Sequence, residues 1–323
     1  MHQFDCRHHH ETTNTMTQLF TQSIIAIVWD FDKTLIPGYM QQPLFEKFGV
    51  DEQAFWAEVN TLPEKYRARG CQQISTEILY LNHILEYVRR GIFAGLTNEM
   101  LRELGSQLEF YPGLPDFFPA LQAGIERVEE FKHHEISLEH YVVSTGLIQM
   151  ILGSSIHPYL DGVWGCEFVE DLNDESHVLA HLGYVLDNTT KTRAIFEINK
   201  GSNKHPEIDV NARVAATDRR IPVQNMIYIA DGPSDVPVFS VINQGGGKTY
   251  GVYRPGSARE FQQVNRLQQQ GRVQSFGPAD YTEGSQTHMW LTNAVTEIAE
   301  RIVRDRERAL GEKVGEAPRH LNG

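Results

Sequence analysis

The sequence has little of what marks secreted, disulfide-bonded or membrane proteins. Its three cysteines, Cys6, Cys71 and Cys166, are odd in number, far apart and without a CxxC pair. They suggest no disulfide framework, so we expect a reducing, cytoplasmic location. The apolar run at 24–29 is far too short to span a bilayer, and no segment has the pattern of a secretory signal. We therefore expect no membrane partner.

Positive charge is scarce as well. The 29 lysines and arginines are outnumbered by 42 aspartates and glutamates, which gives a formal net charge of −13. A nucleic acid would call for a basic face, so we expect no nucleic-acid partner. An anionic substrate could approach only where a metal ion and a few local cations reverse the field.

What is present is the composition of a globular protein. Hydrophobic residues make up 41% of the 323 residues and charged residues 22%, which is the ordinary balance. The length suits one large α/β domain with an insertion, or two modest domains. The polar, histidine-rich start predicts a flexible tail over 1–20, and ordered patterning begins only after Met16, which we consider as a start site.

Short apolar runs alternate with helical patterns along much of the chain. Strand-like runs lie at 24–29, 140–144, 225–231 and 248–253, and helical patterns at 114–125 and 191–198. This alternation predicts an α/β fold with a Rossmann-like, doubly wound parallel sheet. Ligands of such sheets gather at the carboxyl ends of the strands. Three runs end in Asp30, Ser144 and Asp231, which we therefore expect to lie together.

The span 37–110 has helical periodicity and no good strand. A helical insert of this size after the first strand is expected to form a cap domain over the site. The core then comprises 21–36 and 111–323, and it ends in an extension with an amphipathic helix over 289–310. The polar stretch 201–223 has no pattern that predicts an element.

Asp30 and Asp32 lie two residues apart in the DFDKT segment that follows the first apolar run. Phosphoryl transfer needs a nucleophile, a proton donor for the leaving group and positive charge on the phosphoryl oxygens. Two carboxylates at a strand end can divide the first two tasks when their environments differ. The alternative is a turn in which Asp32 caps a following helix.

Four segments resemble, in order, the motifs of the haloacid dehalogenase (HAD) superfamily of phosphatases. The first is the apolar strand followed by DFDKT, and the second is YVVSTG, with Ser144 and Thr145. The third is a downstream lysine, for which Lys191 is the best candidate, and the fourth is YIADGPSD, with Asp231 and Asp235. The resemblance covers roughly 24–255, and the helical insert is similar to the cap of the phosphoserine-phosphatase-like branch.

The resemblance implies an aspartyl-phosphate mechanism. Asp30 would be the nucleophile. Asp32 would protonate the leaving alkoxide and then deprotonate the water that hydrolyses the intermediate. Ser144, Thr145 and Lys191 would bind the phosphate oxygens or neutralise their charge.

The resemblance also implies a Mg²⁺ ion. Asp231 would ligate it together with the carboxylate of Asp30 and the backbone carbonyl of Asp32, and Asp235 would bind a metal-ligated water or orient Lys191. Charge repulsion points the same way, because aspartates converging in one cleft would repel each other and an incoming phosphate without a cation.

Each placement has an ordinary structural alternative. Ser144 could cap the helix that follows it. Lys191 could be a solvated surface lysine, and Lys200 is its rival for the third motif. Asp231 and Asp235 could be turn residues, because DGPSD is turn chemistry.

Two other patterns carry less weight. The GGGKT segment at 245–249 lacks the first glycine of a phosphate-binding loop, and a strand pattern follows it. His133, His134 and His140 lie in a charged segment without metal-ligand spacing, so we expect them on a solvated face.

We expect hydrolysis of a phosphomonoester, with a small phosphorylated metabolite as substrate. Asp32 argues against carbon–halogen cleavage, because a departing halide needs no proton donor. Two alternatives stay open: phosphotransfer to another hydroxyl through the same intermediate, and binding of a phosphometabolite on an inactive fold. Specificity is expected to come from the insert at 37–110.

Overall fold

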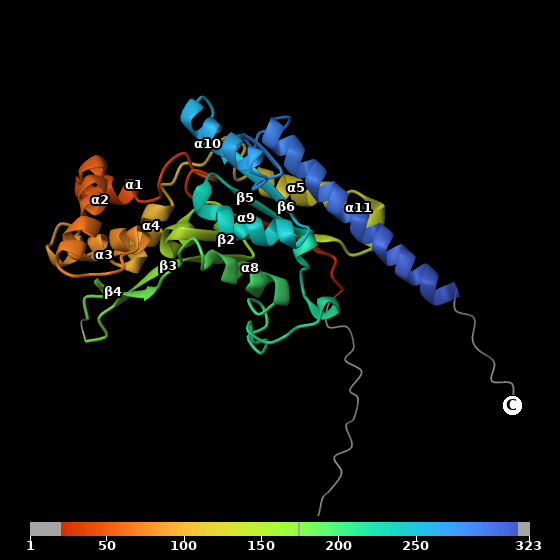
Figure 1. Cartoon of the computed structure of the whole chain (residues 1–323), viewed down its shortest axis with the longest axis horizontal. Coiled ribbons are helices and arrows are strands. Elements are labelled where there is room, and N and C mark those ends of the chain that lie inside the picture. Colours follow the sequence, from red (N-terminus) through yellow and green to blue (C-terminus); the bar gives the residue numbers. More distant parts are fainter. Residues whose placement is uncertain (1–20, 174, 316–323) are drawn as a thin grey trace, which may run out of the picture.

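The computed structural model describes residues 21–173 and 175–315 as a sheet flanked by helices, with a helical group at one end (Figure 1). The tail predicted at 1–20, the start site considered at Met16 and Cys6 lie outside the described residues. Within the described ranges, no helix has both the length and the apolar character that crossing a bilayer requires.

The core is a seven-stranded sheet with the strand order β4-β3-β2-β1-β5-β6-β7. Its strands are β1 (Ile24–Trp29), β2 (Ser137–Leu147), β3 (Gly162–Glu170), β4 (Leu179–Tyr184), β5 (Met226–Ala230), β6 (Lys248–Tyr253) and β7 (Ser275–Pro278). Neighbouring strands are parallel except β3 and β4, which are antiparallel. The predicted doubly wound parallel sheet is confirmed apart from its edge strand β4, which is antiparallel to β3.

Helices cover both faces of this sheet. The helices of the core are α5 (Phe117–Glu126), α6 (Glu129–His133), α7 (Ile148–Gly153), α8 (Lys191–Lys200), α9 (Val236–Gln244), α10 (Ala258–Gln269) and α11 (Gln286–Gly315). Short 3-10 turns are η1 (His157–Tyr159), η2 (Ala216–Asp218), η3 (Val223–Asn225) and η4 (Pro233–Asp235). Helices α5 and α11 pack together on one face, and α8 and α9 pack together on the other (Figure 1).

Strand β1 lies in the centre because both of its faces are apolar. Residues Ile25 to Trp29 are fully buried, as expected of a strand covered by helices on both sides. Trp29 pairs with Val142 of β2 and with Ile229 of β5. The residues that follow these positions therefore emerge at the same carboxyl edge of the sheet.

Between β1 and α5 the chain forms helices and loops and no named strand. The helices are α1 (Gln42–Phe48), α2 (Glu52–Ala68), α3 (Thr76–Arg89) and α4 (Asn98–Gly105). Aromatic contacts hold the first three together, among them Phe45 with Phe55 and Phe55 with Tyr87. Figure 1 shows this helical group at the end of the molecule where β3 and β4 lie.

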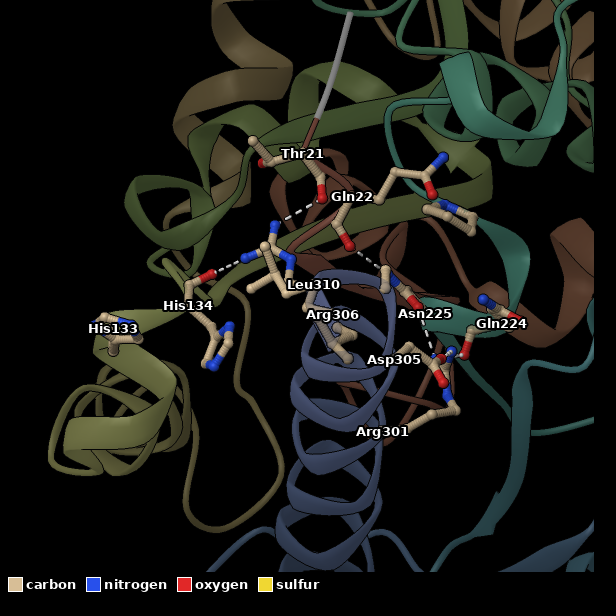
Figure 2. A pocket seen from close by; sticks show the side chains of 13 residues that line it. Thr21, Gln22, His133, His134, Gln224, Asn225, Arg301, Asp305, Arg306 and Leu310 are labelled. Atoms are coloured by element: carbon tan, nitrogen blue, oxygen red, sulfur yellow. Dashed lines mark hydrogen bonds and ion pairs between the residues drawn. The ribbon is translucent and has the colours of Figure 1, made fainter. Parts of the chain in front are cut away.

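The C-terminal helix α11 contains the helix predicted at 289–310 and runs along a polar pocket of about 600 Å³ (Figure 2). Arg306 donates hydrogen bonds to the backbone carbonyls of Thr21 and His134. Arg301 donates to the carbonyl of Gln224 at 2.9 Å and to Oδ1 of Asn225 at 2.6 Å. The guanidinium groups thus attach the helix to the start of β1 and to the segment before β5.

The prediction of a solvated face is wrong for His140. His140, the first residue of the strand predicted at 140–144, lies inside β2, which spans Ser137–Leu147, and its side chain is buried. The indole Nε1 of Trp29 donates to Nδ1 of His140 at 3.3 Å. Burial lowers the pKa of His140 to about 3. His133 is exposed as predicted, and His134 is partly exposed.

Candidate active site

The carboxyl edge of the sheet brings together side chains from four segments. Asp30 follows β1, Asp231 follows β5, and Ser144 lies near the C-terminal end of β2. The backbone N–H of Asp30 donates to the carbonyl of Ile229 at 2.9 Å, which continues the β1–β5 pairing to Asp30. The order of these strands in the sheet, β2-β1-β5, places Asp30 between the other two.

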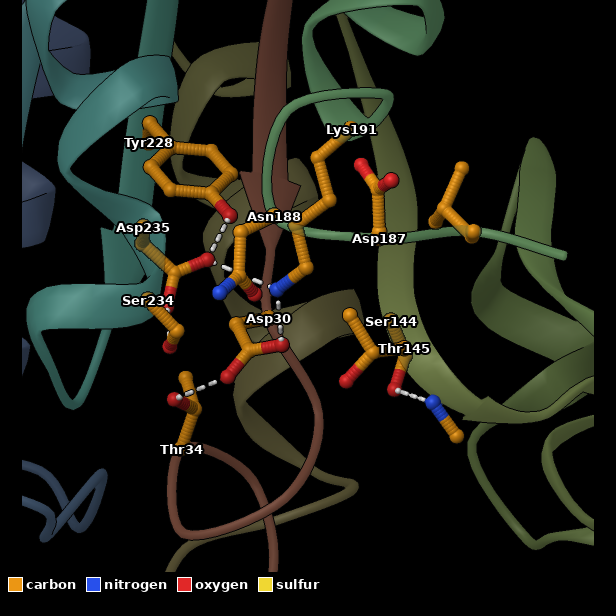
Figure 3. A network of polar contacts seen from close by, with 12 residues as sticks. Asp30, Thr34, Ser144, Thr145, Asp187, Asn188, Lys191, Tyr228, Ser234 and Asp235 are labelled. Atoms are coloured by element: carbon orange, nitrogen blue, oxygen red, sulfur yellow. Dashed lines mark hydrogen bonds and ion pairs between the residues drawn. The ribbon is translucent and has the colours of Figure 1, made fainter. Parts of the chain in front are cut away.

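Lys191 joins two of the aspartates. Its Nζ lies 2.7 Å from Oδ1 of Asp30 and 2.7 Å from Oδ1 of Asp235 (Figure 3). The three side chains are buried, and Lys191 is only 1% exposed. Asp187 begins the turn before α8 and accepts from the backbone N–H of Thr190 at 2.7 Å, which fixes where the helix starts. The alternative of a solvated Lys191 is therefore excluded.

The rival lysine of the third motif lies elsewhere. Lys200 is at the other end of α8, and its Nζ donates to the backbone carbonyls of Val210 and Ala212 at 2.6 and 2.7 Å. These bonds hold part of the stretch 201–223, where the structure contains only short 3-10 turns and loops. Lys191 alone of the two reaches Asp30.

Asp235 has a full set of hydrogen bonds. Besides Lys191, it accepts from the hydroxyl of Tyr228 at 2.6 Å and from that of Ser234 at 2.9 Å (Figure 3). Three such contacts around one buried carboxylate fix its orientation and stabilise its charge. The sequence did not indicate Tyr228, because one aromatic in an apolar strand looks like any core residue.

Asp32 lies in a loop that folds back on itself. Its Oδ1 accepts from the backbone N–H of Met40 at 3.0 Å, and the N-cap residue of α1 is Gln41, without a side-chain cap. Asp32 therefore caps no helix, contrary to the alternative. Thr34, the last residue of the first motif, donates its hydroxyl to Oδ2 of Asp30 at 3.4 Å.

Ser144 and Thr145 lie on the other side of Asp30 from Asp235 (Figure 3). The Oγ of Ser144 accepts from the backbone N–H of Gly146 at 3.0 Å. The N-cap of α7 is Leu147, so the predicted alternative of Ser144 as a helix cap is wrong. The pairing of β2 with β3 is irregular between Val143 and Leu147, and Ser144 in this stretch lies beside Asp30 (Figure 3).

Burial disfavours the ionised form of three carboxyl groups at the site. It raises the pKa of Asp30 to about 6, against the opposing effect of Lys191. Burial and the nearby charge of Asp30 raise the pKa of Asp32 to about 7. Burial, with the charges of Asp30 and Asp235, raises the pKa of Asp231 well above its usual range. The single positive charge of Lys191 does not neutralise the negative charges of these carboxylates.

A divalent cation fits this cluster. Asp30, Asp231 and Asp235 each offer a carboxylate oxygen, and the three oxygens lie within 4.8 Å of one another. A donor set made only of oxygen is the kind that Mg²⁺ prefers. A cation there would stabilise the ionised form of each of the three acids.

Two residues of the helical group also contact the site's loops, and the sequence did not indicate them. The hydroxyl of Tyr80 on α3 donates to the carbonyl of Thr145 at 2.8 Å. Glu77, one turn earlier, accepts from the side-chain amide of Asn188 and, at 3.5 Å, from its backbone N–H. Such contacts depend on how the helices dock, which periodicity does not reveal.

Comparison with other sequences finds one close relative among curated proteins. No protein-family model matches the chain. A protein of Borreliella burgdorferi is 39% identical over 288 residues, which span 85% of this chain and 97% of that protein. That relative is described as an uncharacterized protein, so it brings no activity with it.

Solved structures similar to this chain include a hydrolase, a nucleotidase and phosphatases. A HAD-family hydrolase from Salmonella enterica serovar Typhi has 15% identity and a TM-score of 0.49, over 81% of this chain and 69% of that chain. A cytosolic 5′-nucleotidase IIIB bound to cytidine has 14% identity and a TM-score of 0.46, over 88% of both chains.

A probable phosphoserine phosphatase from Vibrio cholerae has 12% identity and a TM-score of 0.47, over 88% of this chain and 69% of that chain. These likenesses are remote, so the activity has to be argued from the site.

Proposed function

This chain belongs to the same family as the Borreliella burgdorferi protein, and we propose that it is a Mg²⁺-dependent phosphomonoester hydrolase of the HAD superfamily. The observation that carries the proposal is the position of Lys191, which bonds to both Asp30 and Asp235 beside a cluster fit for a cation. Apolar residues of similar volume often stabilise a fold as well as a buried ion pair does, so folding alone does not explain a buried lysine between two aspartates. The substrate class is a small phosphorylated metabolite, and the location is cytoplasmic.

Asp30 is the proposed nucleophile. Its carboxylate lies at the end of the central strand, held by Lys191 and Thr34. Attack on phosphorus forms an aspartyl-phosphate and releases the leaving group as an alcohol once Asp32 gives it a proton. Asp32 then takes a proton from the water that hydrolyses the intermediate. Its raised pKa of about 7 suits a group that must both give and accept a proton.

Ser144, Thr145 and Lys191 are the proposed phosphate-binding residues. They lie around Asp30 (Figure 3), and Lys191 offers positive charge where negative charge gathers on the phosphoryl oxygens. Carboxylates of Asp30 and Asp231 and the backbone carbonyl of Asp32 would hold Mg²⁺. Asp235 already accepts three side-chain bonds, which favours the role of orienting Lys191. Mg²⁺, when bound, would neutralise charge on the aspartates and the phosphoryl oxygens.

The helices between 37 and 110 are the proposed cap domain. Tyr80 and Glu77 connect α3 to the loops that carry Thr145 and Asn188, so the helical group contacts both sides of the phosphate-binding region. This placement supports a role of the insert in enclosing the substrate.

The activity itself is tested by colorimetric phosphate release from p-nitrophenyl phosphate and a panel of phosphorylated metabolites. We expect release with Mg²⁺ and its loss when the metal is chelated. If an added alcohol competes with water for the phosphoryl group, a phosphorylated alcohol forms as product and reveals phosphotransfer. No release from any ester in the presence of Mg²⁺ would leave the protein as a binder of phosphometabolites and refute hydrolysis.

Replacing Asp32 by asparagine is expected to separate substrates by their leaving groups. An alkyl phosphate needs a proton donor, so its phosphorylation step should slow about 10²- to 10⁴-fold. p-Nitrophenolate leaves without a proton, so a single-turnover burst of p-nitrophenol should persist while the following hydrolysis slows. Stopped-flow measurement of both esters checks this, and equal losses would contradict the role of Asp32 as acid.

The same role predicts a pH dependence. The acid form of Asp32 is needed for an alkyl ester, and burial raises its pKa to about 7. The rate of phosphorylation should therefore fall as the pH rises through about 7, and this alkaline limb should vanish in Asp32→Asn. An alkaline limb that persists in the variant would assign it to another group.

Replacing Tyr80 by phenylalanine is expected to lower kcat/KM about fivefold, because the carbonyl of Thr145 loses a hydrogen bond of about 1 kcal/mol. Steady-state kinetics and a thermal melt check this. The matched control is Tyr66→Phe on α2, where the side chain is exposed. Equal kinetics in the two variants would remove Tyr80 from the account.

A further inference from the structure

The proposed function leaves a charge problem at the mouth of the site. The chain carries a net charge of −13, and Lys191 is buried between two aspartates. A dianionic phosphate needs further positive charge along its approach. Two cations follow strands at the same carboxyl edge of the sheet and take no part in the proposed chemistry: Lys33, in the loop after β1, and Arg254, directly after β6.

Lys33 has a backbone conformation that lysine rarely adopts. Its φ is +59°, in the left-handed region where glycine is favoured and a side chain costs free energy. Its Nζ lies 2.7 Å from the hydroxyl of Tyr39 and 4.0 Å from the centre of that ring. Against the opposing effect of burial, Tyr39 and the charges of Asp231 and Glu260 raise the pKa of Lys33. A residue held in a strained backbone conformation beside an active site is often kept for a function.

Arg254 reaches the same place from the other side. Its side chain donates to the backbone carbonyl of Pro37, and its backbone N–H donates to Glu260 at 2.7 Å. The hydroxyl of the buried Tyr111 lies close to the Arg254 guanidinium. Within the described residues, the direct hydrogen-bond partners of the two cationic side chains are neutral oxygens, the hydroxyl of Tyr39 and the carbonyl of Pro37. Positive charge is left over for a ligand.

We propose that Lys33 and Arg254 bind a second anionic group of the substrate, which makes the substrate a phosphate monoester that also bears a carboxylate or a second phosphate. The inference rests on the proposed phosphatase activity. Arginine binds either anion in a bidentate manner, and lysine supplies a point charge. Both lie on the strand edge that carries the metal cluster, so one molecule can place its scissile phosphate at Asp30 and its second anion at these cations.

The test compares kcat/KM for matched esters. Carboxymethyl phosphate is paired with ethyl phosphate, and propane-1,3-diol bisphosphate is paired with propyl phosphate. We expect the doubly anionic ester to be preferred in at least one pair, and the pair that shows it identifies the anion. Lys33→Met and Arg254→Met should each lower the preference about tenfold, as the loss of a charged hydrogen bond implies. The control Arg266→Met, an exposed cation on α10, should keep it.

A second variant separates recognition from folding. Lys33→Gly suits the left-handed backbone, so it should melt no lower than the wild type and still lose the preference. Equal kcat/KM within both pairs in the wild type, or an unchanged preference in the Lys33 variants, would overturn the inference while hydrolysis stands. An unchanged preference in Arg254→Met would remove that residue from the site. Failure of all four esters to react would refute the phosphatase activity instead.

Discussion

Replacing Asp30 by asparagine is expected to lower kcat for every phosphate ester by about 10⁴-fold or more. The amide has nearly the same volume and can still accept the hydrogen bond of Lys191, but it lacks the negative oxygen that attacks phosphorus. The effect should appear in kcat because the missing bond forms only along the reaction path. Folding should change little, since Asn removes one of several mutually repelling charges.

Steady-state phosphate release with saturating Mg²⁺ measures this effect. The matched control is Asp209→Asn, the same change at an exposed loop position, which should keep the wild-type kcat. A thermal melt of both variants excludes misfolding as the cause. An Asp30→Asn enzyme that keeps a tenth of the wild-type rate would contradict nucleophilic catalysis by this residue.

Replacing Lys191 by methionine is expected to lower the free energy of unfolding by about 3–5 kcal/mol, besides abolishing activity. Lys191 is the cation that bonds to Asp30 and Asp235, both buried, and its loss leaves their charges without that partner. Methionine retains the packing of the aliphatic stem, so the loss reports on charge. Urea denaturation without metal measures it.

A divalent cation gives this prediction a second readout. With Lys191 gone, the acidic cluster has more uncompensated charge, so Mg²⁺ should raise the melting temperature of Lys191→Met more than that of the wild type. The control is Lys132→Met, which breaks an exposed pair with Glu129 and should cost under about 1 kcal/mol. A stable, Mg²⁺-insensitive Lys191→Met protein would disprove the charge balance at the site.

The central strands could be predicted because they are buried on both faces. The runs that became β1, β5 and β6 are continuous and apolar, and the structure reproduces them within one residue at each end. Strands β3, β4 and β7 escaped prediction. β3 contains Gly162 and Gly165 and charged residues, β4 is partly exposed at an edge of the sheet, and β7 has only four residues.

The candidate site was predictable to the extent that topology dictates it. Asp30 and Asp231 follow neighbouring parallel strands, so the strand order alone brings them to one edge. Lys191 was a weaker prediction, because it begins a helix, and the strand order does not determine where that helix starts. The positions of Tyr80 and Glu77 near the site depend on how the helices dock, and those of Lys33 and Arg254 depend on how the loops pack. No local sequence pattern encodes either.

The most direct test of the central claim is chemical trapping of the phosphorylated enzyme. The protein is mixed with substrate and Mg²⁺, quenched within one turnover and treated with borohydride, which reduces an acyl phosphate to an alcohol. The account predicts conversion of residue 30 to homoserine in the peptide that contains it, seen by mass spectrometry and absent in Asp30→Asn. Turnover at the usual rate with residue 30 unmodified, or with the modification on another acid, would contradict it.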